Sequence, residues 1–173
     1  SVRLFILSDS PPEKDIQWSE NGMTSSFKFI QKFWSVSEQL LKLFKTSKSS
    51  SKIEIDLFTN QSIDKINQAL DKFRYNVIIA VYHEIYSFFK KILDENKNYE
   101  NLEENFKKIL IIIIPVIPHF TFECLNKMNH ISDLKWPKVD AKYLNNNEKT
   151  IVIQVNGKKR NTLIIGKEIE EKA

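Results

Sequence analysis

The sequence predicts a mainly α protein, an antiparallel helical bundle followed by a short β-hairpin that starts a truncated α+β domain. Three observations support this prediction. Apolar residues recur at helical spacing over most of residues 21–128, with short polar links between the periodic segments. Only 3 glycines occur in 173 residues, which disfavours a turn-rich all-β fold. From Thr150 the period changes to two and leads into Asn156-Gly157, a strong hairpin signal.

Residues 1–20 are predicted to connect the bundle to a preceding part of a longer protein. Residues 2–7 form an apolar, strand-like run, and the double proline Pro11-Pro12 forbids helix across it. The charged loop that follows carries Glu13, Lys14, Asp15 and Trp18. Because the chain does not begin with Met, we expect it to be a fragment.

The first helix of the bundle is predicted to start near Gly22. Its buried face is expected to comprise Phe27, Ile30, Phe33, Trp34, Leu40, Leu41 and Phe44. Lys28 and Lys32 lie four residues apart on the opposite face. They are candidates to extend a basic surface, although an ordinary solvated helix face shows the same pattern.

Residues 62–92 are predicted to contain further helical structure. Ser62 is a candidate N-cap, and Asn76 restarts or continues the helix. The residues expected to be buried are Ile63, Ile66, Leu70, Phe73, Val77, Val81, Ile85, Phe88, Phe89 and Ile92. Residues 53–58 are too short to assign, and residues 97–100 are a polar connector. With the segments on either side, this gives about five helices.

Residues 106–125 are the stretch around which the bundle is expected to pack. The run Ile109 to Ile114 is apolar on every side, which is stable only when surrounded. It falls short of the roughly twenty apolar residues that cross a bilayer, so it predicts a core helix.

Proline marks the end of this core helix and the start of the next. Asn101 and Glu104 are spaced as a capping box for the first helix. Pro115 removes a backbone donor and should end that helix, whereas Pro118 suits the first turn of the next. The second helix is expected to stop near Asn129.

The sequence contains no recognisable catalytic or metal-binding motif. The three histidines lack cysteine or carboxylate partners at metal-ligand spacing, and His119 is predicted to be half-buried. The lone Cys124 lies in apolar sequence and is predicted to be a buried structural thiol, which fits a reducing cytosolic compartment. The net charge of +4 permits a polyanionic partner without requiring one.

Lys158, Lys159 and Arg160 are the strongest binding candidates on chemistry alone. They follow the predicted turn as three consecutive cations on the return strand. Such a cluster suits phosphate contacts, but a charged edge strand that prevents aggregation has the same composition. Both interpretations remain open from the residues themselves.

Several motifs resemble the bacterial leucyl-tRNA synthetase family. Residues 8–19, SDSPPEKDIQWS, are similar to its S-P-P-E-(K/R)-D-(L/I)-x-W-S segment, and residues 27–34, FKFIQKFW, to F-R-F-L-x-R-x-W. Residues 73–76 resemble an R-F-N motif, and residues 115–123 the P-F-x-P-H-x-x-E-E corner. The pair Trp136-Pro137 matches a W-P anchor, and residues 152–160 the V-Q-V-N-G-K-x-R start of the C-terminal domain. Phe122, Asn126 and Asn161 depart from these patterns.

The resemblance implies a class I anticodon-binding-type bundle at residues 21–147. Residues 1–20 would link it to an absent catalytic domain, and residues 148–173 would start the C-terminal tRNA-binding domain. The tRNA contacts implied are Lys158, Lys159, Arg160, Lys28 and Lys32. The contacts implied with the catalytic domain are Pro11, Pro12, Glu13, Lys14, Asp15 and Trp18.

The same resemblance implies the activity of the whole enzyme, which ligates leucine to its tRNA with ATP. This fragment would have no catalytic centre or cofactor, because ATP and Mg would bind in the catalytic domain. Its partners would be tRNA(Leu) and the enzyme's own catalytic domain, with no membrane, in a cytoplasmic monomer. The alternative is a helical protein-interaction module without RNA binding.

Overall fold

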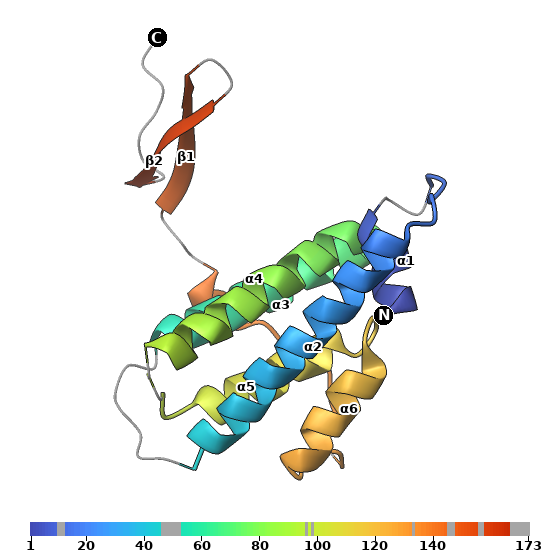
Figure 1. Ribbon diagram of the computed structural model, residues 1–173. Coiled ribbons are helices and arrows are strands. Elements are labelled where there is room, and N and C mark those ends of the chain that lie inside the picture. The colour runs from blue at the N-terminus through green and yellow to red at the C-terminus, as the bar shows by residue number, and fades with distance from the viewer. Residues whose placement is uncertain are drawn as a thin grey trace. The chain divides into compact units, whose positions relative to one another are not determined.

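Six α-helices and one antiparallel strand pair occur in the part of the chain that the structure describes (Figure 1). The computed structural model describes residues 1–9, 13–45, 53–95, 97, 99–132, 134–144, 148–155 and 158–166. The helices are α1 (Val2–Asp9), α2 (Glu20–Leu43), α3 (Ile53–Asp71), α4 (Tyr75–Asp94), α5 (Leu102–Ile113) and α6 (Pro118–Lys127), and the short 3₁₀ helix η1 is Ala141–Tyr143. The strands are β1 (Glu148–Val155) and β2 (Lys158–Gly166). The chain divides into two compact units, Ser1–Val139 and Asp140–Ala173.

Phe106 of α5 belongs to the hydrophobic core of the first unit. Its side chain is fully buried, and its ring centroid lies 5.1 Å from Phe89 of α4 and 6.0 Å from Phe44, just after α2. The expectation that residues 106–125 lie within the bundle is confirmed for Ile109 to Ile113, all of which are buried. At the corner that follows, Val116 and Ile117 are buried. Pro115 and His119 are exposed, so the prediction of a half-buried His119 is wrong.

Pro115 ends α5 as predicted and leaves backbone carbonyls that other elements satisfy. The N–H of Val116 bonds to the carbonyl of Ile113 at 3.2 Å, one residue short of the α-helical pattern. The carbonyl of Ile112 therefore lacks its helical donor and instead accepts from the hydroxyl of Tyr82 on α4 at 3.1 Å. Arg3 of α1 donates from Nη1 to the carbonyl of Pro115 at 3.2 Å. These two contacts join α1 and α4 to the corner.

The strand-like assignment of residues 2–7 is wrong, because these residues form α1. Leu4 and Phe5 are buried, and α1 contacts α2 and α4. A helix satisfies its own backbone hydrogen bonds, whereas a strand here would need a partner strand. The ring of Phe5 lies so close to Gly22 that any side chain there would collide with it, which explains the glycine in the first turn of α2.

Helix α2 begins at Glu20, two residues before the predicted start. Ser19 is its N-cap, and the Ser19 hydroxyl accepts from the N–H of Gly22 at 3.2 Å. Phe33 and Leu40 are buried as expected, but Phe27 is 51% exposed. The buried face of α2 carries Phe29, Phe33, Val36 and Leu40, and Phe27 lies outside that face.

Helix α3 starts at Ile53, and its early start corrects two predictions. Residues 53–58 belong to this helix, and Ile55 is fully buried within it. Ser62 is therefore not an N-cap: it lies inside α3, where its hydroxyl donates to the carbonyl of Phe58 at 2.8 Å.

In α4, Val77 is 40% exposed although it was expected in the core.

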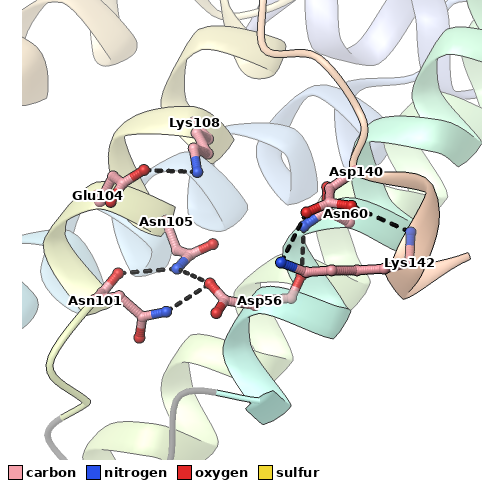
Figure 2. A network of polar contacts seen from close by, with 8 residues as sticks. All are labelled: Asp56, Asn60, Asn101, Glu104, Asn105, Lys108, Asp140 and Lys142. Atoms are coloured by element: carbon pink, nitrogen blue, oxygen red, sulfur yellow. Dashed lines mark hydrogen bonds and ion pairs between the residues drawn. The ribbon is translucent and has the colours of Figure 1, made fainter.

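Asp56 of α3 joins α3 to α5 through two asparagines, as Figure 2 shows. Its Oδ1 accepts from Nδ2 of Asn101 and, at 2.8 Å, from Nδ2 of Asn105. Asn101 does occupy the N-cap position of α5, but its side chain makes no cap hydrogen bond. The capping box with Glu104 is therefore wrong: Glu104 pairs with Lys108 at 2.7 Å instead. The amide of Asn101 serves a contact between helices.

Phe73 separates α3 from α4 with a backbone conformation that few side chains favour. Its φ is 52°, and the N–H of Arg74 returns to the carbonyl of Ala69 at 2.8 Å. Asn129 ends α6 in the same way, with φ 58° and a bond of 2.9 Å from His130 to the carbonyl of Leu125. Glycine and asparagine are the residues usually found at such helix ends, because other side chains are strained there.

We expect Phe73→Gly to raise the free energy of unfolding by about 1 kcal/mol, because glycine adopts this conformation without steric strain. Urea unfolding followed by circular dichroism measures the difference. Asn129→Gly is the matched control, since asparagine already tolerates a positive φ, and it should change stability by less than about 0.5 kcal/mol. A Phe73→Gly variant that is less stable than the original chain would contradict this account of the helix end.

The second unit contains η1 and the paired strands β1 and β2. The register pairs Glu148 with Gly166 at one end and Val155 with Lys158 at the other, and it shifts between Ile153 and Gln154. The predicted turn residues Asn156 and Gly157 lie outside the described residues.

Candidate nucleic-acid interface

The lysines of the first unit fall into two groups, those with carboxylate partners and those without. Lys65 pairs with Glu84 at 2.7 Å, Lys97 with Glu95 at 2.6 Å, and Lys127 with Glu38 at 3.1 Å. Within the described ranges, no carboxylate lies at ion-pair distance from Lys28, Lys32 or Lys90. A lysine without such a partner offers its full charge to an external anion.

Two of the lysines without carboxylate partners face each other across the groove between α2 and α4. Lys32, Ser35 and Gln39 line one side, and Tyr86, Lys90 and Asp94 line the other; the volume of this open groove is about 200 Å³. Lys28 lies one turn before Lys32 on α2, and both are exposed. The cations outnumber the single carboxylate, so the groove presents a net positive charge with hydroxyl and amide groups beside it. Such a set suits phosphate and sugar oxygens.

The fold explains why these lysines reach solvent together. On α2 the buried face runs through Phe29, Phe33 and Val36, which leaves Lys28 and Lys32 on the adjacent exposed face. The direct contact between α2 and α4 brings Lys90 opposite them. Sequence reasoning identified Lys28 and Lys32 but missed Lys90, because pairing of these two helices cannot be read from either segment alone.

His83 lies on α4 near this groove and adds little positive charge at neutral pH. Its ring centroid is 4.1 Å from that of Phe29. Burial lowers the pKa of His83 below its ordinary value, so the neutral form is favoured at pH 7. The lysines, rather than the histidine, therefore supply the charge of this surface.

The three cations predicted to bind tRNA lie at the start of β2. Lys158 pairs with Val155 and Lys159 with Gln154, whereas Asn161 pairs with Ile153. Arg160 is therefore the extra residue of a β-bulge on this strand. A bulge locally interrupts the ladder and increases strand twist, and bulges are frequent beside functional sites. The role of these residues in binding stays a prediction.

The residues expected at the interface with the preceding domain are exposed wherever the structure describes them. Glu13, Lys14 and Asp15 are exposed, and Trp18 is 62% exposed with its ring 5.5 Å from that of Phe5. Val2 and Ile6 add exposed apolar surface one turn apart on α1. Pro11 and Pro12 lie outside the described residues. The interface itself stays a prediction.

Candidate metal ligands do not cluster among the described residues. These residues contain no group of three or more His, Cys, Asp or Glu side chains arranged to hold a metal ion. Cys124 is fully buried as predicted, and burial raises the pKa of its thiol to about 11, so it is protonated and unreactive at neutral pH. None of the helices in the described ranges has the length and hydropathy needed to span a bilayer.

Trp136 and Pro137 hold the segment after α6 against the bundle. Pro137 is buried, and Nε1 of Trp136 donates to Oδ1 of Asn67 on α3 at 2.9 Å. Leu134 and Val139 on either side pack partly against the core. The sequence prediction of an anchor at this pair is confirmed by these contacts.

Known proteins resemble this chain in sequence and in fold. The family model described as the anticodon-binding domain of tRNA ligase matches residues 53–173. A leucine–tRNA ligase of Fusobacterium nucleatum subsp. nucleatum is 32% identical over 189 residues, which cover 99% of this chain and 22% of the relative. One of Allorhizobium ampelinum is 29% identical over 188 residues, with 100% and 22% covered. The chain thus spans about a fifth of the length of the curated relatives it matches.

A solved structure shares the fold. It is the crystal structure of the ternary complex of Agrobacterium radiobacter K84 agnB2 LeuRS-tRNA-LeuAMS, and the match has a TM-score of 0.72 and 17% sequence identity. The match covers 98% of this chain and 23% of that chain. From the helical bundle with its proline corner and the family match over most of its length, this chain belongs to the family of anticodon-binding domains of tRNA ligases.

Proposed function

We propose that this chain is the tRNA-docking part of a leucine–tRNA ligase, the enzyme that joins leucine to its tRNA with ATP. The supporting observation is the groove between α2 and α4, where Lys32 and Lys90 lack carboxylate partners in the described ranges and Lys28 lies one turn away. Relatives matched over nearly the whole chain are leucine–tRNA ligases, and the structural neighbour contains tRNA. Contacts through phosphate and shape suit a structured RNA.

In this proposal the three predicted parts of the chain have different tasks. Residues 21–147 contain the helical bundle that supports the tRNA, and residues 148–173 begin a C-terminal α+β domain whose first hairpin carries Lys158, Lys159 and Arg160. Residues 1–20 link the bundle to a catalytic domain, against which Trp18, Val2 and Ile6 pack. ATP and Mg act in that catalytic domain, in a cytoplasmic enzyme that works as a monomer.

The double variant Lys32→Glu, Lys90→Glu is expected to weaken binding of tRNA(Leu) about tenfold at low salt, because it replaces attraction to phosphate with repulsion. Fluorescence anisotropy of labelled tRNA measures the affinity. The slope of log affinity against log salt should also fall by about 0.9 for each phosphate that the variant no longer neutralises.

The matched control is the double variant Lys107→Glu, Lys138→Glu, which changes the net charge equally at residues that do not line the groove. It should bind within about threefold of the original chain. Equal weakening in both doubles would show that net charge alone, and not this groove, attracts the RNA. Equal affinity of the original chain for tRNA and for an unrelated polyanion would instead favour a protein-interaction module.

A further inference from the structure

The corner between α3 and α4 carries an aromatic residue that the fold does not need. Phe73 adopts φ 52°, in a helix end where glycine or asparagine is favoured. Its side chain is 62% exposed, and its ring contact among the described residues is with Tyr75, at 6.3 Å between centroids. Phenylalanine is strained in this backbone conformation, and its side chain is not buried, so burial does not offset the strain. The exposed ring of Phe73 is therefore free to contact a binding partner.

Two cations flank this ring in the sequence, and both are exposed. Lys72 and Arg74 have no carboxylate at ion-pair distance within the described ranges. Both line a depression of about 340 Å³ with Lys65, Gln68 and Glu84. Lys65 and Glu84 neutralise each other at 2.7 Å, and Asp71 is the acidic residue nearest in sequence. The corner therefore combines an exposed ring with a net positive charge.

This combination matches what an unpaired nucleotide requires. Each base has a flat face that stacks on an aromatic ring, whichever base it is, and the phosphates on both sides are anionic. A protein partner for an exposed ring more often offers an apolar pocket, and the neighbours at this corner would then be apolar. The depression has apolar residues in its wall, Ala69, Val77, Ala80 and Val81, but its other five lining residues are charged or polar, and Lys72 and Arg74 are the two that adjoin the ring in the sequence.

We propose that Phe73 is a stacking platform for an unpaired base of RNA bound to the bundle, with Lys72 and Arg74 contacting the adjoining phosphates. The proposal rests on the tRNA-docking function and adds a second contact to it, on the α3–α4 corner rather than in the α2–α4 groove. It assigns single-stranded nucleotides, such as those in a loop of tRNA, to this corner.

The test compares Phe73→Leu, Phe73→Trp and Phe122→Leu in the 173-residue chain. Loss of the aromatic face in Phe73→Leu should weaken tRNA binding about tenfold, as expected for one stacked base. Phe73→Trp should bind within about twofold, because it keeps a stacking face. Phe122 is a matched control, since it is an exposed phenylalanine on α6 whose sequence neighbours are Thr121 and Glu123. Its change to Leu should leave the affinity unaltered.

Salt dependence separates stacking from charge. Phe73→Leu should lower the affinity without changing the slope of log affinity against log salt, whereas Lys72→Ala should reduce the slope by about 0.7, the value for a phosphate of a single strand. Phe73→Gly also lacks the ring and is expected to be the more stable protein, so reduced binding by this variant cannot come from unfolding. Reduced binding by both Phe73→Gly and Phe73→Leu, with normal binding by Phe122→Leu, supports the proposal.

Three outcomes would overturn it. Unchanged tRNA affinity in Phe73→Leu, with normal binding by the original chain, would reject the stacking contact alone and leave the docking function in place. Equal losses in Phe73→Leu and Phe122→Leu would remove any special role of the corner. No tRNA binding by the original chain would reject both the docking function and this contact.

Discussion

Replacing Phe106 with Ala is expected to lower the free energy of unfolding of the bundle by about 3–5 kcal/mol, the range for deleting a large aromatic side chain from a core. Phe106 is fully buried and lies between Phe44 and Phe89, at 6.0 Å and 5.1 Å between ring centroids. Its removal leaves a cavity where α5 meets α4 and the end of α2. Interiors this close-packed relax only partly around such a cavity, so both transfer and cavity costs apply.

Urea unfolding followed by helical circular dichroism measures this loss. Phe106→Leu should cost less, because it keeps much of the buried volume. Phe27→Ala is the control for losing an aromatic ring without making a cavity, since Phe27 is 51% exposed, and it should cost less than about 1 kcal/mol. If Phe106→Ala cost no more than Phe27→Ala, the bundle would not be organised around this residue.

The polar contacts at the proline corner connect helices that are distant in sequence. The buried carbonyl of Ile112 would be unsatisfied after the helix ends, and Tyr82 of α4 satisfies it, while Arg3 of α1 donates to the exposed carbonyl of Pro115. Burial raises the pKa of Tyr82, so its hydroxyl stays protonated and able to donate at neutral pH. The corner thus joins helices distant in sequence.

The sequence predicts those parts of the fold whose causes are local. Pro115 and Pro118 place the end of α5 and the start of α6 because proline acts on its own backbone. The start of α3 and the helical state of residues 2–9 depend on packing against other elements. Local patterns therefore predicted a strand-like run at residues 2–7 and left residues 53–58 unassigned. Asn101 is a further example. Its spacing suits an N-cap, but its side-chain amide donates to Asp56 on another helix instead.

The candidate site likewise contains some residues that the sequence identifies and others that only the packing of the helices identifies. Exposure of Lys28 and Lys32 follows from the period of α2, which is visible in the sequence. Lys90 joins them only because α4 packs beside α2. Phe73 was expected in the core from its spacing after Leu70, but its positive φ, a backbone property outside helical periodicity, ends α3 and leaves the ring at the surface.

The triple variant Lys158→Glu, Lys159→Glu, Arg160→Glu is expected to weaken tRNA(Leu) binding by several kcal/mol at low salt, or roughly 100-fold or more. The three residues follow one another on β2, and the bulge at Arg160 increases the twist of the strand there. Reversal replaces three attractive charges with three repulsive ones beside a polyanion. If each residue neutralises one phosphate, the salt slope should fall by about 2.7, at about 0.9 for each phosphate.

A charge-conserving triple, Lys158→Arg, Lys159→Arg, Arg160→Lys, separates the charges from the shape of the strand. It should bind within about threefold, because phosphate contacts depend mainly on charge. Filter binding at several salt concentrations measures all three proteins, and unfolding of the first unit should be the same in each, since the changes lie in the second unit. Unchanged affinity in the Glu triple would show that the hairpin does not touch RNA, and tRNA docking would then depend on the bundle alone.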